Sequence, residues 1–312
     1  MLVEIACDES GYEGDKLIGT TTDVFAHASV RLDLAAAAGC VGELRARIRS
    51  PALEYKANHL LREKHRAVLE WLLGPTSPVY GRARVYLVDK ALHVVTGVAG
   101  PLLADPAAVA ALHRDGPAVF GPERWAAFLV AANDLLRTRD RLDVRGPVER
   151  FLAAVDALAA AGAAGPVGDT VARLRRAGHR AEAWRSRLAA DPELVSPLDP
   201  LPAAIARAVA YWGEGGEPVF VVHDRQNTLS PARVARLAAA LGPGRLADLT
   251  LVGSGADPRV QVADILAGAA RKIASDALNA HPDPILTALL HPYLDPLSIW
   301  AGAFPPPHLP WR

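Results

Sequence analysis

Cysteine is scarce in this chain, and several other marks of common protein classes are missing. The 312 residues include only two cysteines, Cys7 and Cys40, which excludes a disulfide framework and is typical of a reducing cytoplasm. The N-terminus lacks the basic region and long apolar core of a signal peptide, and no apolar run is long enough to span a bilayer. The sequence therefore predicts a cytoplasmic protein with no membrane partner. Its wealth of Ala, Arg and Pro is typical of a bacterial gene of high GC content.

The chain also has no net charge and none of the common nucleotide-binding and hydrolase motifs. The formal net charge is zero, so no overall basic field attracts nucleic acid, and any such binding requires a local patch. The chain contains no phosphate-loop lysine motif, no Gly-x-Gly-x-x-Gly, no Gly-x-Ser-x-Gly and no Cys/His spacing for zinc. These absences leave carboxylates as the residues most able to carry chemistry.

Half of the chain is apolar, and its short apolar runs are typical of buried strands. Strands are predicted at 2–7, 23–32, 82–90, 218–224 and 248–255. The first two form a hairpin most simply. Helices are predicted at 34–49, 61–73, 231–241 and 259–278, the third with Ser230 as its N-cap and Pro231 at its first position.

The stretch from Pro101 to about Gly213 has a different composition. It is rich in Ala, Leu and Arg, is interrupted by Gly-Pro pairs and shows no strand pattern. It predicts helices at about 107–114, 122–139, 146–161, 168–190 and 200–212. The fold class is therefore α/β, a mixed sheet flanked by helices with a large all-helical insertion. The predicted parts are a core in two pieces, 1–100 and 214–280, a helical insertion or subdomain at 101–213, and a Pro-rich arm at 281–312.

Three predicted strands end in acids, at Asp8 followed by Glu9, at Asp89 and at Asp224. Buried carboxylates are costly to desolvate unless a positive group compensates them, and the end of a strand at a sheet edge is a natural place for a divalent metal. Glu9 alternates away from Asp8, so it lies behind the metal ligands or in solvent. The alternative is that Asp8 and Glu9 only begin a solvated turn, in which Gly11 supplies the positive φ.

The last long helix carries a single acid among small apolar residues. Gln261, Asp264 and Gly268 share one face of it, and an acid in such surroundings is out of place without a partner. The alternative is that Asp264 pairs with Arg271 or Lys272 at the helix surface.

A fourth candidate acid lies in the step Glu54–Tyr55–Lys56. In an extended segment Glu54 and Lys56 point to the same face. A carboxylate can hold a metal there while the lysine positions a phosphate or a water. A simple ion pair is the alternative.

These motifs together resemble those of the DUF3800 family, a largely uncharacterised group of ribonuclease H-like proteins. The resemblance is carried by Asp8–Glu9–Ser10–Gly11, Glu54–Tyr55–Lys56, Val222–His223–Asp224 and Val260–Gly268. It covers roughly residues 1–95 and 215–280. It implies a ribonuclease H-like mixed sheet with helices on both sides, and a metal-dependent nuclease site at Asp8, Asp224 and Asp264.

The predicted function is accordingly two-metal hydrolysis of a nucleic-acid phosphodiester with Mg²⁺ or Mn²⁺, in which metal charge offsets carboxylate repulsion. The expected metal ligands are Asp8, Asp224, Asp264 and Glu54. The catalytic set adds Lys56 as the group that binds the scissile phosphate. The expected substrate-binding residues are Lys56, Ser10, Gln261 and Arg225.

Two alternatives remain open at this stage. A restriction-enzyme-like nuclease would use Asp8 with Glu54 and Lys56 and leave Asp264 structural. A non-catalytic module would use the helical insertion to hold a protein or nucleic acid. The basic run 173–187 is either the solvated face of a helix or a phosphate-backbone surface.

Overall fold

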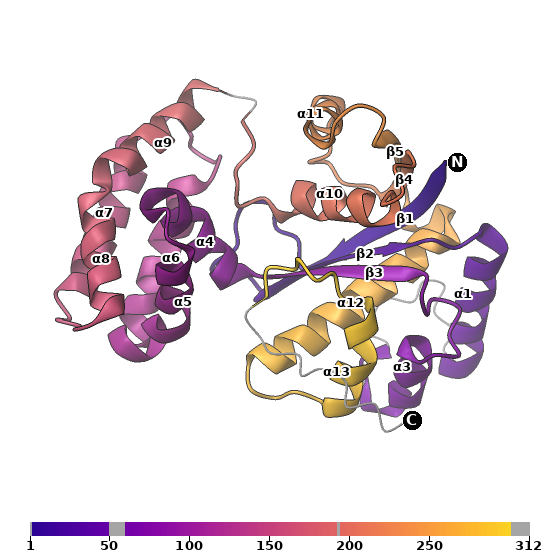
Figure 1. The fold of residues 1–312 in the computed structure, drawn as a ribbon. Helices are drawn as coiled ribbons and strands as arrows, with labels where there is room; N and C mark the ends of the chain where they lie inside the picture. The colour runs from indigo at the N-terminus through magenta and orange to yellow at the C-terminus, as the bar shows by residue number, and fades with distance from the viewer. Residues whose placement is uncertain (1, 50–59, 192–193, 301–312) are drawn as a thin grey trace. The chain divides into compact units, whose positions relative to one another are not determined.

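The computed structural model describes residues 2–49, 60–191 and 194–300, which form two compact units (Figure 1). The first unit takes its residues from Met1–Tyr12, Val24–Val88 and Leu201–Arg312, and the second from Glu13–Asp23 and Asp89–Pro200. None of the helices in these described ranges is long and apolar enough to cross a membrane.

The first unit is built on a five-stranded mixed sheet in the order β3-β2-β1-β4-β5. The strands are β1 Val3–Ser10, β2 Val24–Val30, β3 Ala83–Asp89, β4 Val219–Asp224 and β5 Leu246–Val252. The first strand is central, antiparallel to β2 and parallel to β4, and β4 is parallel to β5. The predicted α/β class with a mixed sheet is therefore confirmed, and so is the antiparallel pairing of the first two strands.

The pairing of β2 with β3 is also antiparallel. The amide of Arg31, after the end of β2, donates to the carbonyl of Arg82, before the start of β3, at 2.8 Å. At the other end, the amide of Lys90 donates to the carbonyl of Asp23 at 3.0 Å. Hydrogen bonds between the end of one strand and the start of the other require opposite directions.

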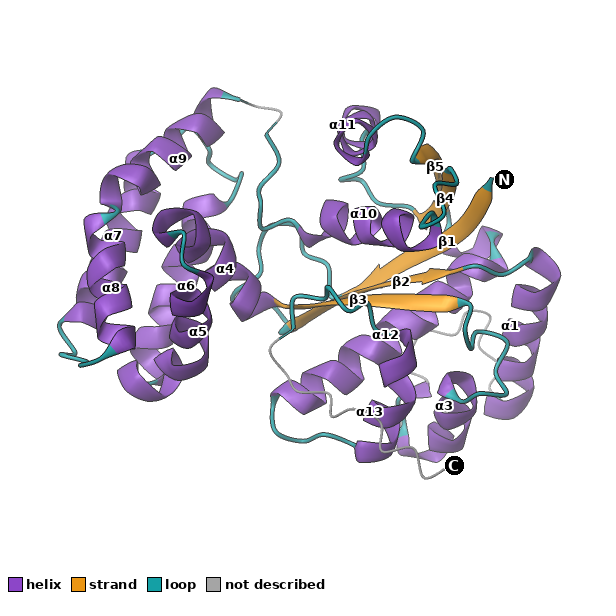
Figure 2. Cartoon of the chain, in the orientation of Figure 1, coloured by secondary structure: helices purple, strands orange, loops and turns teal. Residues whose placement is uncertain are grey.

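Helices cover both faces of this sheet (Figure 2). One face carries α1 Leu34–Ile48, α3 Arg66–Leu73, α12 Pro258–Leu278 and α13 Pro284–Leu290, and the other carries α10 Pro200–Trp212 and α11 Pro231–Leu241. The strand residues that face α12 are small, namely Ala6, Ala26 and Ala28. Because α12 itself buries five alanines and Gly268, it lies close against β1 and β2.

Helix α10 belongs to the first unit, although its sequence resembles the helical block before it. Leu201, Ile205 and Val209 are fully buried against the sheet residues of β1 and β4. Their spacing of four residues places them on one helix face. Composition alone could not show this, because an amphipathic helix has the same pattern whether it packs on a sheet or on other helices.

The second unit is helical. Its helices are α4 Lys90–Leu103, α5 Pro106–Phe120, α6 Pro122–Leu136, α7 Arg145–Ala159, α8 Pro166–Arg176 and α9 Gly178–Ala190. Sequence analysis missed α4, whose N-terminus is capped by the Asp89 side chain accepting from the Leu92 amide at 3.1 Å. The single helix predicted at 168–190 is wrong, because the chain leaves helical geometry at Ala177.

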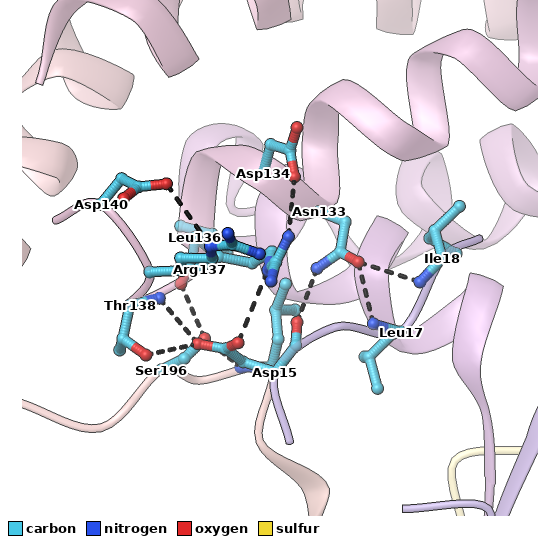
Figure 3. A network of polar contacts seen from close by, with 12 residues as sticks. Asp15, Leu17, Ile18, Asn133, Asp134, Leu136, Arg137, Thr138, Asp140 and Ser196 are labelled. Atoms are coloured by element: carbon cyan, nitrogen blue, oxygen red, sulfur yellow. Dashed lines mark hydrogen bonds and ion pairs between the residues drawn. The ribbon is translucent and has the colours of Figure 1, made fainter. Parts of the chain in front are cut away.

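A buried asparagine fastens the segment 13–23 to the end of α6 (Figure 3). The Asn133 Oδ1 accepts hydrogen bonds from the amides of Leu17 and Ile18, both at 2.9 Å, and its Nδ2 donates to the carbonyl of Asp15 at 2.8 Å. The Asp15 carboxylate in turn accepts from the amide and hydroxyl of Thr138, both at 2.7 Å. This loop between β1 and β2 therefore has its backbone groups satisfied by the helical unit.

Part of the basic run 173–187 serves to hold the helical unit together. The Arg185 side chain is 1 % exposed and donates to the carbonyls of Arg137 and Asp140 at 2.6 and 2.8 Å. Arg173 forms an ion pair with Asp105 at 2.7 Å. These two guanidinium groups bind polar groups beside the ends of helices α6 and α5. They therefore do not form a phosphate-backbone surface.

We expect Asn133→Ala to lower the free energy of unfolding by about 2–4 kcal/mol, because it leaves the amides of Leu17 and Ile18 without a partner in a buried site. Urea denaturation followed by circular dichroism measures the change. The matched control is Asn227→Ala, whose side chain is exposed. Equal stability of Asn133→Ala and the unsubstituted protein would contradict the role given to this side chain.

Candidate functional site

Three acids from distant parts of the sequence meet at one edge of the sheet. The parallel register pairs Cys7 of β1 with His223 of β4, so the next residues, Asp8 and Asp224, both point to the opposite face, the one covered by α12. Asp264 lies in the second turn of that helix. The carboxyl ends of two parallel strands and the N-terminal part of α12 thus bring these acids together.

Their mutual influence appears in the ionisation of Asp8. The Asp8 side chain is buried, and burial is the main cause that raises its pKa from 3.8 to about 9. The negative charges of Glu9, Asp264 and Asp224 raise it further, in that order, while a hydrogen bond from the Glu9 amide at 2.7 Å opposes them. Repulsion of this kind indicates that the carboxylates lie near one another.

Glu9 lies on the other face of the sheet, and its side chain is only 6 % exposed. The antiparallel register sets it beside His27, and Gln226 donates a hydrogen bond to its Oε1. Burial raises its pKa to about 7, with Asp224 and Asp264 adding to the shift and Gln226 opposing it. Of the two positions expected for Glu9, the one behind the candidate metal ligands applies and the solvent position does not, because its side chain is buried beside His27, His223 and Gln226.

Two buried histidines complete this second face. The Nε2 atoms of His27 and His223 lie 3.2 Å apart, and the Nε2 of His223 is 3.7 Å from the Oε2 of Glu9. Burial lowers the pKa of both imidazoles, so both are neutral near pH 7.

The hydrogen bonds of His223 define the tautomers of the pair. Its Nδ1 lies 2.9 Å from the carbonyl of Asp224, which only accepts, so Nδ1 carries the proton. The Nε2 of His223 is then an acceptor, and His27 donates to it. This chain of contacts fixes the backbone that carries Asp224 and links it to β2.

A cation is present at the same edge. The Nε of Arg271 donates to the hydroxyl of Ser10 at 2.9 Å. Ser10 follows Asp8 by two residues and faces the same way, and Arg271 lies seven residues after Asp264 on one helix face. Lys272 instead pairs with Asp276 on the exposed side of α12.

The predicted site residues divide into those that meet and those outside the described ranges. Asp8, Asp224 and Asp264 meet, and Ser10 lies at the same edge. Gln261 is half-buried one turn before Asp264, and Arg225 is exposed directly after β4. Glu54 and Lys56 fall outside the described residues.

Sequence reasoning missed His27 and Gln226, found no partner for His223, and named Arg271 only as a surface partner of Asp264. Strand periodicity places His223, which precedes Asp224 on β4, on the second face, whereas β2 has no acid from which to place His27. Their pairing across β1, however, depends on the strand order. The seven-residue spacing of Arg271 from Asp264 places both on one helix face, but its contact with Ser10 depends on the packing of α12 against β1.

Within the described part of the chain, no group of three or more His, Cys, Asp or Glu side chains stands where it could hold a metal ion. The carboxylates are close enough to repel one another, so a cation would have to draw them inward from their present positions. The donor set itself, carboxylate oxygens from three elements, is the kind that Mg²⁺ and Mn²⁺ prefer.

No protein-family model matches this chain, and no curated protein or solved structure is detectably similar to it. The resemblance to the DUF3800 family therefore stays a prediction that depends on the quoted motifs.

We expect Asp8→Asn to stabilise the metal-free protein at pH 7 by about 1–3 kcal/mol. The carboxyl group of Asp8 ionises near pH 3.8 when unfolded and near 9 when folded, so it lowers stability as the pH rises between these values. Asparagine carries no such charge and can still accept from the Glu9 amide.

Thermal unfolding in EDTA from pH 4 to pH 8 tests this, and the gain should shrink towards pH 4. The control is Asp33→Asn at the exposed N-cap of α1, where asparagine caps as well as aspartate. A loss of stability in Asp8→Asn at pH 7 would show that Asp8 is a structural residue.

Proposed function

We propose that the protein is a metal-dependent phosphodiesterase of ribonuclease H-like type that hydrolyses a nucleic-acid phosphodiester. The observation that carries the proposal is the electrostatic coupling of Asp8 with Asp224 and Asp264 at the end of the central strand. A buried acid whose pKa is raised by neighbouring carboxylates is costly to the fold, and such groups cluster at functional sites. The mixed sheet with helices on both faces agrees with what the family resemblance implies.

Mg²⁺ or Mn²⁺ suits the donors present. Asp8, Asp224 and Asp264 would hold the cation, with Glu54 as the further predicted ligand. When bound, a divalent cation supplies charge neutralisation and an activated water. The raised pKa of Asp8 supports this assignment, because a positive charge would remove the repulsion that raises it.

Other residues of the chain supply binding and positioning. Ser10 orients the Arg271 guanidinium by accepting from its Nε, which leaves its terminal nitrogens to bind a phosphate of the substrate. The imidazole of His223 holds the Asp224 carbonyl and so positions the end of β4. Lys56 stays a predicted phosphate ligand.

A second candidate function is a non-catalytic binding module on the same fold. It is favoured by one observation, that the described carboxylates do not form a group ready to hold a metal. Calorimetric titration with Mn²⁺ separates the two functions, since a module would show no binding at near-millimolar concentration.

We expect Asp8→Asn, Asp224→Asn and Asp264→Asn each to lower Mn²⁺-dependent cleavage of labelled RNA and DNA by about 100-fold or more. Asp276→Asn on the exposed side of the same helix is the control. Full activity of Asp264→Asn with loss in Asp8→Asn would favour the restriction-enzyme-like alternative. Absence of both cleavage and Mn²⁺ binding in the unsubstituted protein would refute the proposed function.

We expect Arg271→Ala to raise the KM for a nucleic-acid substrate by about tenfold with a smaller change in kcat, because a charge-assisted phosphate contact is worth about 1.5–3 kcal/mol. Steady-state kinetics measures both constants. Lys272→Ala, the next residue along the helix, is the matched control. An unchanged KM in Arg271→Ala would remove this residue from the substrate site.

A further inference from the structure

A polar pocket lies at the opposite end of the first unit's sheet from the acids. Its volume is about 710 Å³, which is within the usual range for small-molecule sites. It is bounded by the start of β1, the connection from β2 to α1, the turn before β3, the end of α10 and the start of α12. Figure 1 shows the start of β1, the start of α1 and the end of α10 at this end of the sheet.

The pocket is separate from the carboxylate site. Glu4 lines it, and Asp8 follows four residues later on the same strand, a distance of about 13 Å along an extended chain. None of the acids Asp8, Asp224 and Asp264 lines the pocket. A ligand bound here would therefore leave the proposed hydrolytic edge free.

The acids that line the pocket already have partners. Glu4 accepts from the Arg259 guanidinium at 2.6 Å, and Arg259 also pairs with Asp257 at 2.7 Å. The Asp33 carboxylate accepts from the Ala36 amide at 2.7 Å as the N-cap of α1. Both acids of the lining thus already have hydrogen-bond partners within the protein.

Two arginines of the lining differ in this respect. Arg31 and Arg82 are exposed neighbours on adjacent chain segments, joined by the backbone hydrogen bond between them. Within the described residues, neither side chain has a hydrogen bond or an ion pair. Two neighbouring guanidinium groups without an acid form a site for a phosphate, which their planar forks bind well. Gly81, with a φ of 72°, adds no side chain between them and the pocket.

The remaining wall is apolar and contains an indole. The Nε1 of Trp212 donates to the Ser29 hydroxyl at 2.9 Å, and the ring of Tyr211 packs against it edge-on at 4.9 Å. These contacts fix the plane of the indole. Leu34 adds an apolar surface that is 54 % exposed. A fixed indole beside cations is the surface on which a nucleobase stacks.

We propose that this pocket binds a nucleotide, with its phosphate on Arg31 and Arg82 and its base against Trp212. The ligand is either a free nucleoside monophosphate or the phosphorylated end of a single strand, since both present the same groups. Binding requires no divalent cation and none of the three acids.

Calorimetric titration of the full chain in EDTA tests this proposal. The probes are AMP, GMP, CMP and UMP, with inorganic phosphate and adenosine as partial ligands and a 5′-phosphorylated tetranucleotide as the strand end. We expect at least one nucleotide or the tetranucleotide to bind with a Kd below about 1 mM. Phosphate and adenosine alone should bind at least tenfold more weakly. Binding of the tetranucleotide without the mononucleotides would assign the pocket to a strand end.

Variants locate the binding in the pocket. The double substitution Arg31→Ala with Arg82→Ala should weaken nucleotide binding at least tenfold, whereas Arg124→Ala, an exposed arginine of α6, should not change it. Trp212→Leu should weaken nucleotide binding, and Trp212→Phe, which keeps an aromatic ring, should retain it if the fold is intact by circular dichroism.

The same titration on Asp8→Asn separates this proposal from the proposed function. Unchanged nucleotide binding in that variant supports an independent pocket, even if the protein shows no hydrolysis. No binding by any probe, phosphate binding as tight as nucleotide binding, or full binding in the double arginine variant would each overturn the proposal.

Discussion

Repulsion among carboxylates at the end of the central strand is the constraint on which the rest of the first unit depends. Burial raises the pKa of Asp8 to about 9, and the charges of Glu9, Asp264 and Asp224 add to the shift; within the described residues no purely structural benefit of that arrangement is visible. Hydrophobic burial of α12 against β1 and β2 is what holds the acids together despite their repulsion. The close contact requires the alanines of both elements, since larger side chains would separate helix from sheet.

The two faces of the sheet at the end of β1 carry different groups. On the α12 face, Asp8 and Asp224 meet Asp264, with Arg271 held near them by Ser10. On the other face, the two histidines are buried and neutral near pH 7, and burial raises the pKa of Glu9 to about 7. The alternation of side chains along β1 and β4 separates these groups by only one residue. One short stretch of sequence therefore supplies both the candidate reacting groups and the contacts that position them.

The role of an arginine in this protein depends on its surroundings in the fold. Arg185 is buried and donates to backbone carbonyls after the end of α6, whereas Arg31 and Arg82 are exposed beside a pocket and have no acid partner among the described residues. The charge run that seemed the best phosphate surface is largely occupied with internal contacts. Arg31 and Arg82, which lie outside any charge run in the sequence, are available to a ligand.

Local signals in the sequence determined most of the elements of this protein. The apolar runs ending in Asp8 and Asp224, the Ser230–Pro231 start of α11 and the long final helix are each set by interactions within a few residues, so periodicity and capping reveal them. The same signals singled out Asp264 as an acid in an apolar helix. The α/β class follows from the same elements.

Tertiary structure alone decided how these parts are combined. The pairing of His27 with His223 depends on β1 lying between β2 and β4, and the assignment of α10 to the sheet depends on which apolar face it meets. The coupling of Asp8 to Asp264 joins residues more than 250 positions apart, and burial by the surrounding core sets its strength. Such contacts cannot be inferred from local sequence. Their free energy arises only when the complete sheet and its covering helices exclude water from the strand ends.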